Sequence, residues 1–231
     1  MSDITVAHLR AIAPGANQQI IEGLVPYLNL YLPQYEINTL LRVAHFLGQT
    51  AEESASYRTL KEYASGSEYE GRTDLGNTQA GDGVKYKGRG MLQLTGRANY
   101  TTMSQILGID LVNHPELAET PEVAVQTACE YWKTHKLNVY ADADDINTIT
   151  RRINGGTNGL QMRVDFVNKA KQVLDGVFGD TPDPVSNGID MHVTGHVVPT
   201  PVDVPVTTPV AGAAPANTGS NGFFSFILKW F

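Results

Sequence analysis

A glycine-rich stretch from Ser65 to Gly90 is the feature that most constrains how this 231-residue chain folds. It has few large aliphatic residues, and its seven glycines are Gly66, Gly71, Gly76, Gly81, Gly83, Gly88 and Gly90. The helical spacing of apolar residues stops here, so we predict a long irregular loop. Loops of this length inside a compact domain are usually either functional or disordered. Tyr69 and Tyr86 favour an ordered loop.

Helical spacing of apolar residues dominates the chain on both sides of this loop. The first helix is expected to be capped by Ser2 or Asp3 and to run through Leu9 and Ile12. Later helical segments are expected at Ile20–Leu32 (punctuated by Pro26 and Pro33), Leu40–Ser54 (capped by Asn38), Gly96–Leu107, Pro121–Trp132, Ile146–Ile153 and Met162–Leu174. Strand signals are few, so the predicted fold class is mainly α, in a domain covering residues 1–178.

Charge and cysteine content limit the classes of protein to consider. The net charge of −7, from 17 basic and 24 acidic residues, argues against a general nucleic-acid binder. The one cysteine, Cys129, cannot form an internal disulfide and has no partner at metal-ligand spacing, so we expect a buried thiol and no metal or cofactor. The N-terminus lacks the pattern of a secretory signal, and no run reaches the roughly 20 apolar residues of a membrane span. We therefore expect synthesis in the cytoplasm.

The composition changes sharply after the helical domain. Residues 179–222 hold seven of the 12 prolines and show no helical period, which predicts an extended, disordered linker. The last nine residues, FFSFILKWF, are too short to span a bilayer. They are expected to form an interfacial membrane anchor, to dock on the domain itself or to bind a partner. The residues of this tail proposed for membrane contact are Phe223, Phe224, Phe226, Ile227, Leu228, Trp230 and Phe231.

The segment Ala44–Glu62 carries acids that either serve one site or lie on the surface. Gln49 and Glu53 are four residues apart and share one face of the expected helix. A continuous helix from Glu53 to Glu62 would turn roughly 900° and hold the two carboxylates about 13 Å apart on opposite faces. If both acids serve one site, the helix must therefore end between them. Weak helix formers from Ser54 to Thr59 allow that break.

Three stretches of the chain share a pattern with a known family. The first is Ala44–Ser54, which contains Glu53; the second is the run KGRGMLQLTGRANY at Lys87–Tyr100. The third is Ile153–Gly156, with the sequence INGG, followed by Arg163. In this order and spacing they resemble the catalytic domain of glycoside hydrolase family 19, which includes plant-type chitinases and many bacteriophage endolysins. The resemblance covers roughly residues 1–175 and implies a lysozyme-like α-helical domain with a long glycine-rich active-site loop.

The resemblance also implies roles for individual residues. Family 19 enzymes are inverting hydrolases, which need a protonated acid and a base about 6.5–9.5 Å apart on opposite faces of the sugar. By the resemblance Glu53 is the acid, Glu62 is the base, and the Thr95 hydroxyl helps to hold the attacking water. Arg163 matches an arginine near the acid, where its charge would tune carboxylate pKa values. The predicted substrate-binding residues on these motifs are Gln93, Asn99, Tyr100, Asn154, Arg163 and Arg89.

Two departures from the family pattern leave alternatives open. The family often has histidine before the catalytic acid, whereas this chain has Glu52, which points about 100° away from Glu53 on a helix. Only one of the two acids is therefore expected to face a given site. The spacing to the base varies in the family, so Glu68 and Glu70 are alternatives to Glu62. A basic run at residues 85–97 would meet acidic substrate groups, pair with site acids or lie solvated on the surface.

The single cysteine and the N-terminal pattern favour a phage or prophage endolysin over a secreted chitinase. We expect it to cleave the β-1,4 glycan of peptidoglycan as a monomer, without nucleic acid, causing lysis of the host cell. It would wait in the host cytoplasm until a holin releases it to the cell wall. The alternatives are a bacterial chitinase, a non-catalytic cell-wall-binding module, and a secreted antibacterial effector with the same chemistry.

Overall fold

The computed structural model describes residues 3–180, and this part of the chain is almost entirely helices and turns. The helices are α1 (Val6–Ile12), α2 (Gln18–Tyr31), α3 (Leu40–Glu53), α4 (Asp82–Lys85), α5 (Arg97–Leu107), α6 (Pro121–Thr134), α7 (Leu137–Asp142), α8 (Ile146–Asn154) and α9 (Leu160–Leu174). Short 3-10 helices are η1 (Leu32–Tyr35), η2 (Ser67–Tyr69), η3 (Thr73–Leu75) and η4 (Pro115–Glu119). The mainly α fold class is confirmed. The predicted linker and aromatic tail lie outside the described residues.

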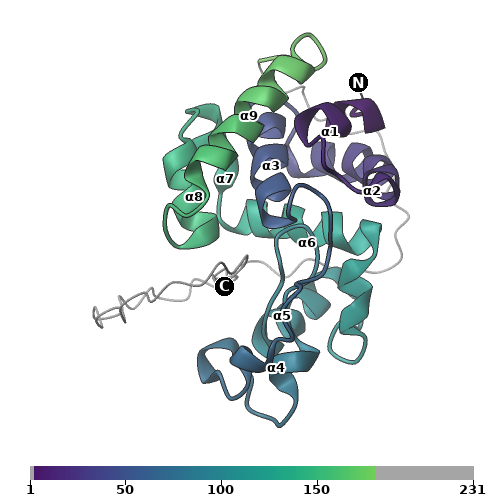
Figure 1. Ribbon diagram of the computed structural model, residues 1–231, viewed down its shortest axis with the longest axis vertical. Helices are drawn as coiled ribbons and strands as arrows, with labels where there is room; N and C mark the ends of the chain where they lie inside the picture. Colours follow the sequence, from purple (N-terminus) through teal and green to yellow (C-terminus); the bar gives the residue numbers. More distant parts are fainter. Residues whose placement is uncertain (1–2, 181–231) are drawn as a thin grey trace. The chain divides into compact units, whose positions relative to one another are not determined.

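Helix α3 lies among the other helices and pairs most extensively with α9 (Figure 1). Gly48 makes this close approach possible, because a methyl group placed on it would lie 2.4 Å from Val167 Cγ2 and 2.9 Å from the Val167 nitrogen. Residues Val43–Ala51 of α3 are all buried, including the polar side chains of His45, Gln49 and Thr50. The last turns of α3 are therefore packed against other parts of the protein on several sides.

A single hydrophobic core joins these helices. Phe46 of α3 meets Trp132 of α6 edge-to-face, with ring centroids 5.3 Å apart, and the Trp132 indole donates a hydrogen bond to Asn138 Oδ1 at 2.8 Å. Such aromatic pairs stabilise a core beyond the area that they bury. Cys129 of α6 is fully buried in the same core, which confirms the expected buried thiol. Among residues 3–180, no helix is both long and apolar enough to cross a membrane.

The glycine-rich stretch is ordered and contains η2, η3 and α4, which its sequence pattern did not indicate. In Figure 1 this segment and α5 extend away from α3 and α9, toward the bottom of the view. Glu70 holds the loop together, because its carboxylate accepts hydrogen bonds from Gly81 N at 2.6 Å and from Gly83 N at 2.8 Å. The prediction of a long ordered loop is confirmed, with local helical turns inside it.

Several predicted helix ends were wrong by one or more residues. Thr5, and not Ser2 or Asp3, caps α1, because Thr5 and His8 form a reciprocal capping box. Thr39, and not Asn38, caps α3 through its hydroxyl, which accepts from Arg42 N at 3.3 Å. Pro26 does not interrupt α2. It is exposed, so water can satisfy the carbonyl group that loses its helical donor.

Candidate active site

The helix that carries Glu53 ends at that residue, as the proposed pairing with Glu62 requires. Ser54 leaves helical geometry, and the next three residues adopt left-handed conformations, with φ of 53°, 63° and 55° at Ala55, Ser56 and Tyr57. Non-glycine residues adopt this region at a cost, so the surroundings must hold the turn. The buried Tyr57 hydroxyl does so by donating to the Leu47 carbonyl at 2.8 Å. The predicted break in the helix is confirmed.

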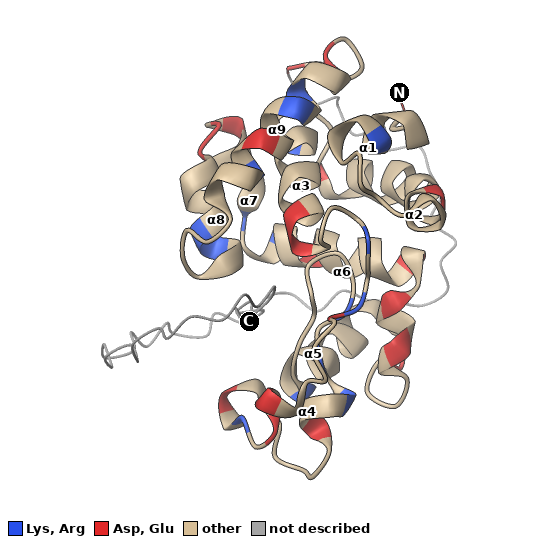
Figure 2. Ribbon diagram, in the orientation of Figure 1, with Lys and Arg blue, Asp and Glu red and all other residues tan. Residues whose placement is uncertain are grey.

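Glu53 is buried against a single guanidinium group. Arg163 of α9 donates from Nη2 to Glu53 Oε1 at 2.5 Å and from Nη1 to Gln49 Oε1 at 2.6 Å. Gln49 in turn donates to Thr150 Oγ1 of α8 at 3.2 Å. Glu53 and Arg163 are 6% and 2% exposed. In Figure 2 the acidic residues of α3 lie at its end next to α6. Three helices thus fix the position of the predicted acid.

Glu62 lies in an extended segment that pairs with the motif at residues 87–95. Its backbone nitrogen donates to the Gly88 carbonyl at 2.9 Å. Its side chain accepts from Gly88 N at 3.0 Å on one oxygen and from the Tyr69 hydroxyl at 2.7 Å on the other. Charge-assisted hydrogen bonds of this kind are stronger than neutral ones. Both carboxylate oxygens of the predicted base, which is 4% exposed, are therefore held in place.

Gly88 is the point around which three predicted site residues converge. A methyl group placed on it would lie 2.7 Å from Gln93 Oε1, 3.2 Å from Glu62 Oε2 and 3.3 Å from Thr95 Oγ1. A side chain at position 88 would therefore force Gln93 to move and would crowd Glu62 and Thr95. The Thr95 hydroxyl donates to the Gln93 carbonyl at 2.8 Å. The predicted base and the hydroxyl predicted to hold water thus lie beside one another.

A tight turn in the motif brings these residues together. Arg89 and Leu94 exchange backbone hydrogen bonds, at 3.1 Å from Arg89 N and 2.7 Å from Leu94 N. Gln93 has φ of 49°, and its side-chain amide donates to the Gly90 carbonyl at 2.9 Å. Gly90 N donates to the Leu60 carbonyl at 2.8 Å, which attaches the turn to the segment that leads to Glu62. The GRG and QLT parts of the motif are therefore one structural unit.

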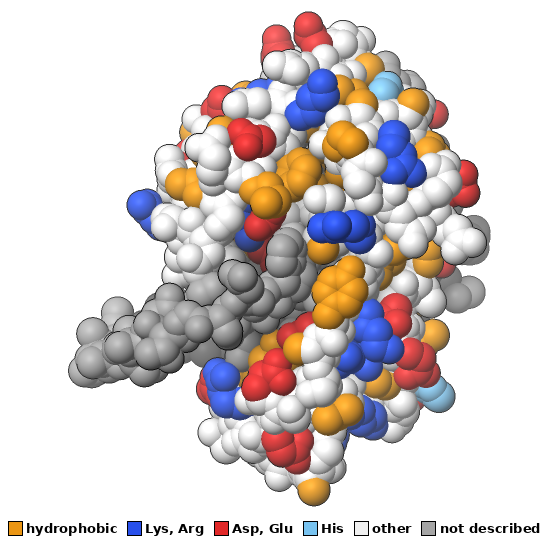
Figure 3. Space-filling view, viewed as in Figure 1, with side chains coloured by type: hydrophobic (Ala, Val, Ile, Leu, Met, Phe, Trp, Pro, Cys, Tyr) orange, Lys and Arg blue, Asp and Glu red, His pale blue; other side chains and the backbone are white. Residues whose placement is uncertain are grey.

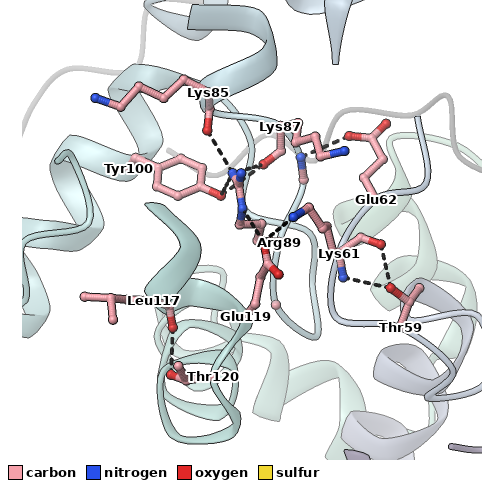
Figure 4. Close-up of polar contacts among 12 residues, drawn as sticks. Thr59, Lys61, Glu62, Lys85, Lys87, Arg89, Tyr100, Leu117, Glu119 and Thr120 are labelled. Atoms are coloured by element: carbon pink, nitrogen blue, oxygen red, sulfur yellow. Dashed lines mark hydrogen bonds and ion pairs between the residues drawn. The ribbon is translucent and has the colours of Figure 1, made fainter. Parts of the chain in front are cut away.

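Arg89 lies at the centre of a buried network beside Glu62 (Figure 4). Its Nε donates to Glu119 Oε1 at 2.7 Å, and its Nη1 donates to the Lys85 and Lys87 carbonyls at 2.9 and 3.2 Å. Nη1 also meets the Tyr100 hydroxyl at 3.1 Å, and that hydroxyl donates to the Lys87 carbonyl at 3.0 Å. In this structure Arg89 and Tyr100 hold the backbone of the motif. Their contact with substrate stays a prediction.

The other members of the basic run also contact protein groups. Lys87 Nζ donates to the Ala64 carbonyl at 2.7 Å, and Arg97 forms an ion pair with Asp82 at the start of α4. Lys85 Nζ lies 5.2 Å from the centre of the Tyr86 ring. On the face of the molecule shown in Figure 3, acidic side chains (red) and basic side chains (blue) lie among one another. The basic run therefore stabilises the loop through these contacts with Ala64, Asp82 and Tyr86, none of which is a predicted catalytic acid.

The two predicted asparagines belong to two of the sequence motifs and lie on helices α5 and α8. Asn99 of α5 is half-buried and donates to the Thr95 carbonyl at 2.6 Å. Asn154 is the last residue of α8, and its Oδ1 is buried without a hydrogen-bond partner among the described residues. Buried polar atoms nearly always have a partner, so an unpaired carbonyl oxygen is available to accept from a ligand. Substrate binding by both residues stays a prediction.

Glu62 and the two alternative bases, Glu68 and Glu70, have different surroundings, and the choice among them stays a prediction. The Glu70 carboxylate caps the amides before and within α4, and Glu68 is exposed on η2. Neither touches the unit around Gly88. Tyr69, whose hydroxyl donates to Glu62, was not among the predicted site residues, because no local sequence pattern connects it to Glu62. Burial and the hydrogen bond to Glu62 raise the pKa of the Tyr69 hydroxyl, so it stays protonated and donates. Among residues 3–180, no group of three metal-ligating side chains is present.

Comparisons with known proteins agree with this arrangement. Residues 41–152 match the family model for class I chitinases of glycoside hydrolase family 19. A glycosyl hydrolase family 19 domain-containing protein of Haemophilus influenzae is 40% identical over 95 residues, which cover 41% of this chain and 46% of that protein. An endochitinase of Arabidopsis thaliana is 35% identical over 132 residues, covering 54% and 44%. The chain thus spans about half the length of the curated relatives it matches.

Solved structures share the fold. Chitinase C of Streptomyces griseus superposes with a TM-score of 0.60 at 24% identity, covering 78% of this chain and 79% of that one. A bacterial family 19 chitinase gives 0.57 at 25% identity, covering 74% and 95%. The family match and the fold support a chitinase-like glycoside hydrolase domain. The family match, the relatives and the shared fold support a glycoside hydrolase family 19 catalytic domain in this chain, with residues 41–152 as the part that the family model matches.

Proposed function

We propose that this chain hydrolyses the β-1,4 glycosidic bonds of bacterial peptidoglycan with inversion at the anomeric carbon. The observation that carries the proposal is the pair of buried carboxylates, Glu53 and Glu62, each held by its own set of donors. One lies at the end of α3 and the other in the segment beside the glycine-rich loop. Inverting glycosidases use two such carboxyl groups on opposite faces of the sugar.

In the proposed reaction Glu53 acts in its protonated form. It gives its proton to the glycosidic oxygen as the bond to the anomeric carbon breaks, so the leaving sugar departs as a neutral alcohol. A water molecule attacks the opposite face of the anomeric carbon and loses a proton to the Glu62 carboxylate. The Thr95 hydroxyl, beside Glu62, orients this water. Proton exchange with solvent then restores both carboxyl groups.

The surroundings of Glu62 suit a base that must not move. The Tyr69 hydroxyl and the Gly88 amide hold its two oxygens, and the bare Gly88 leaves room for Gln93 and Thr95 beside it. Groups fixed in this way need no reorganisation when the water is deprotonated. Gln93, Asn99 and the unpaired Asn154 oxygen supply further polar atoms for sugar hydroxyl and acetamido groups.

Peptidoglycan is proposed as the substrate because of the cysteine content of the chain. The whole chain has one cysteine, and it is buried. This suits a protein that stays reduced before it acts. The biological role proposed is that of an endolysin: it is held in the host cytoplasm until a holin gives it access to the wall. Membrane contact through the tail at residues 223–231 belongs to this proposal. Chitin is the second candidate, since curated relatives of this chain are named endochitinases.

Product analysis tests the proposed reaction. Purified peptidoglycan and chitin oligomers are each incubated with the wild-type chain and with Glu53→Gln, and the products are examined by mass spectrometry. The proposal predicts hydrolysed muropeptides with new reducing ends for the wild type and a loss of turnover in the variant, with an unchanged circular dichroism spectrum. Turnover of chitin alone would support the second candidate. Binding to cell walls without new reducing ends would contradict both, and would indicate a binding module.

A further inference from the structure

Two consecutive acids at the end of α3 lie against the same turn of α9. Glu53 accepts from Arg163 at 2.5 Å. A methyl group placed on Gly159 would lie 2.3 Å from Glu52 Oε1, so the Glu52 carboxyl packs directly on the bare backbone of Gly159. Arg163 N donates to the Gly159 carbonyl at 3.0 Å, which makes these two residues neighbours one turn apart. Both acids therefore contact this part of the protein, although they point about 100° apart on α3.

Among the described residues, the acidic side chains at this turn of α9 outnumber the basic ones. One guanidinium, that of the buried Arg163, stands against the carboxylates of Glu52 and Glu53. Burial raises the pKa of the Glu52 carboxyl, the charge of Arg163 opposes this rise, and the charge of Glu53 adds to it. From α6, Tyr131 also faces Glu53, and burial raises the pKa of its hydroxyl, so it stays neutral. The Tyr131 hydroxyl donates to the Arg152 carbonyl of α8 at 2.8 Å, and the charge of Arg152 opposes the rise in the pKa of Tyr131.

A general acid must hold its proton at the working pH. Arg163 donates a hydrogen bond to Glu53, and a positive charge beside a carboxyl group opposes that requirement. A second negative charge nearby has the reverse effect, because like charges favour the protonated form. We propose that Glu52 is a positioning residue of the active site, whose negative charge offsets that of Arg163 and keeps the catalytic proton on Glu53. The inference rests on the proposed role of Glu53 as the acid.

The direction of the effect does not depend on which carboxyl carries the proton first. Two coupled carboxyl groups lose their protons in two steps that belong to the pair. The last proton leaves at higher pH than it would from the same acid beside a neutral residue, because its loss creates a second negative charge. Removing the charge at position 52 should therefore ionise Glu53 at lower pH and make the enzyme lose activity earlier as the pH rises.

The pH dependence of kcat/KM tests this inference. Glu52→Gln is compared with Glu52→Asp, which keeps the charge, and with Glu22→Gln, which removes an exposed charge from α2. The alkaline limb of the profile is expected to move by about one pH unit to lower pH in Glu52→Gln. It is expected to stay within a few tenths of a unit in Glu52→Asp and in Glu22→Gln. An unmoved limb in Glu52→Gln, with only lower thermal stability, would mean that Glu52 merely supports α9 and would overturn the inference.

A second measurement needs neither substrate nor turnover. The side-chain carboxyl carbons of glutamate are labelled, and the Glu53 signal is assigned by its absence in Glu53→Gln. This signal should titrate at lower pH in Glu52→Gln than in the wild type, and equal midpoints would refute the coupling. If Glu52→Gln does not fold, Glu52→His, which places the residue that the family often has at this position, takes its place with the same expected direction. A wild type that hydrolyses neither glycan would refute the proposed function, while the titration still decides the coupling.

Discussion

Replacing Tyr69 by phenylalanine removes one of the two hydrogen-bond donors that the described residues give to the Glu62 carboxylate. The Tyr69 hydroxyl donates to Glu62 Oε1 at 2.7 Å, and the Gly88 amide donates to the other oxygen at 3.0 Å. The ring of Tyr69 is buried, so phenylalanine keeps its packing. The variant therefore isolates the hydroxyl. We predict a slower reaction with little change in the fold.

The size of the effect follows from the bond that is lost. A hydrogen bond to a charged group contributes about 1.5–3 kcal/mol. The Gly88 amide remains, so the lower part of this range applies, about 1.5–2 kcal/mol. If this energy holds Glu62 in its reactive position, kcat should fall about 10- to 30-fold, since each ~1.4 kcal/mol in the barrier is a factor of ten. KM should change less, because the contact is with the base and not with the sugar.

Steady-state rates of reducing-end release from purified peptidoglycan measure this loss. Tyr27→Phe is the matched control, because Tyr27 of α2 loses a hydroxyl outside the site and should keep wild-type rates. Circular dichroism and thermal unfolding show whether Tyr69→Phe is folded. A folded Tyr69→Phe variant with a wild-type kcat would refute the reasoning that this hydrogen bond holds the base.

Three further outcomes follow from packing and protonation. Gly88→Ala should lower kcat roughly 10-fold, because the added methyl group would lie 2.7 Å from Gln93 Oε1 and 3.2 Å from Glu62 Oε2, so that both side chains must shift; kinetics on the folded variant check this. Gly48→Ala should lower the free energy of unfolding by about 1–3 kcal/mol, since its methyl group would lie 2.4 Å from Val167 Cγ2; urea unfolding measures it. Burial lowers the pKa of His45 from 6.5, so the unfolded chain binds more protons below that pH. The contribution of His45 to stability is therefore complete above pH 6.5 and is lost as the pH falls, which urea titrations between pH 7 and 5 check.

Gly15→Ala is the control for both glycine variants, because a methyl group there would meet no atom within 4 Å. Wild-type turnover by Gly88→Ala would contradict the convergence of side chains at that glycine. Unchanged stability of Gly48→Ala would contradict the close packing of α3 on α9. A free energy of unfolding that stays constant between pH 7 and 5 would contradict a buried, neutral His45.

The helices could be predicted from the sequence because their apolar spacing is local information. The end of α3 near Ser54 was also predictable, because weak helix formers follow Glu53. The residues that cap the helices were harder to predict. Asn38 and Thr39 are adjacent and both good capping residues, and only the geometry of the entering chain selects Thr39. Helix α7 (Leu137–Asp142) was missed because six residues are too few to show a period.

The site could be predicted from the sequence only in part. Local reasoning placed Gln49 and Glu53 on one face of a helix, and Arg163 binds both of them. Glu62 could not be separated from Glu68 and Glu70 by spacing, because the glycine-rich loop has no period to fix directions. The hydrogen bonds from Tyr69 and Gly88 to Glu62 favour this residue, but no local sequence pattern indicates them.

The stereochemistry of the first product tests the paired-carboxylate account most directly. Proton NMR follows the anomeric signals in the first minutes after the enzyme meets a β-1,4-linked N-acetylglucosamine or peptidoglycan oligomer, before mutarotation mixes the two forms. If Glu53 protonates the leaving oxygen while Glu62 activates water on the opposite face, the α-anomer appears first and the β-anomer follows at the rate of mutarotation. A β-anomer that appears first would contradict the account, because it would require a covalent intermediate and a different role for Glu62.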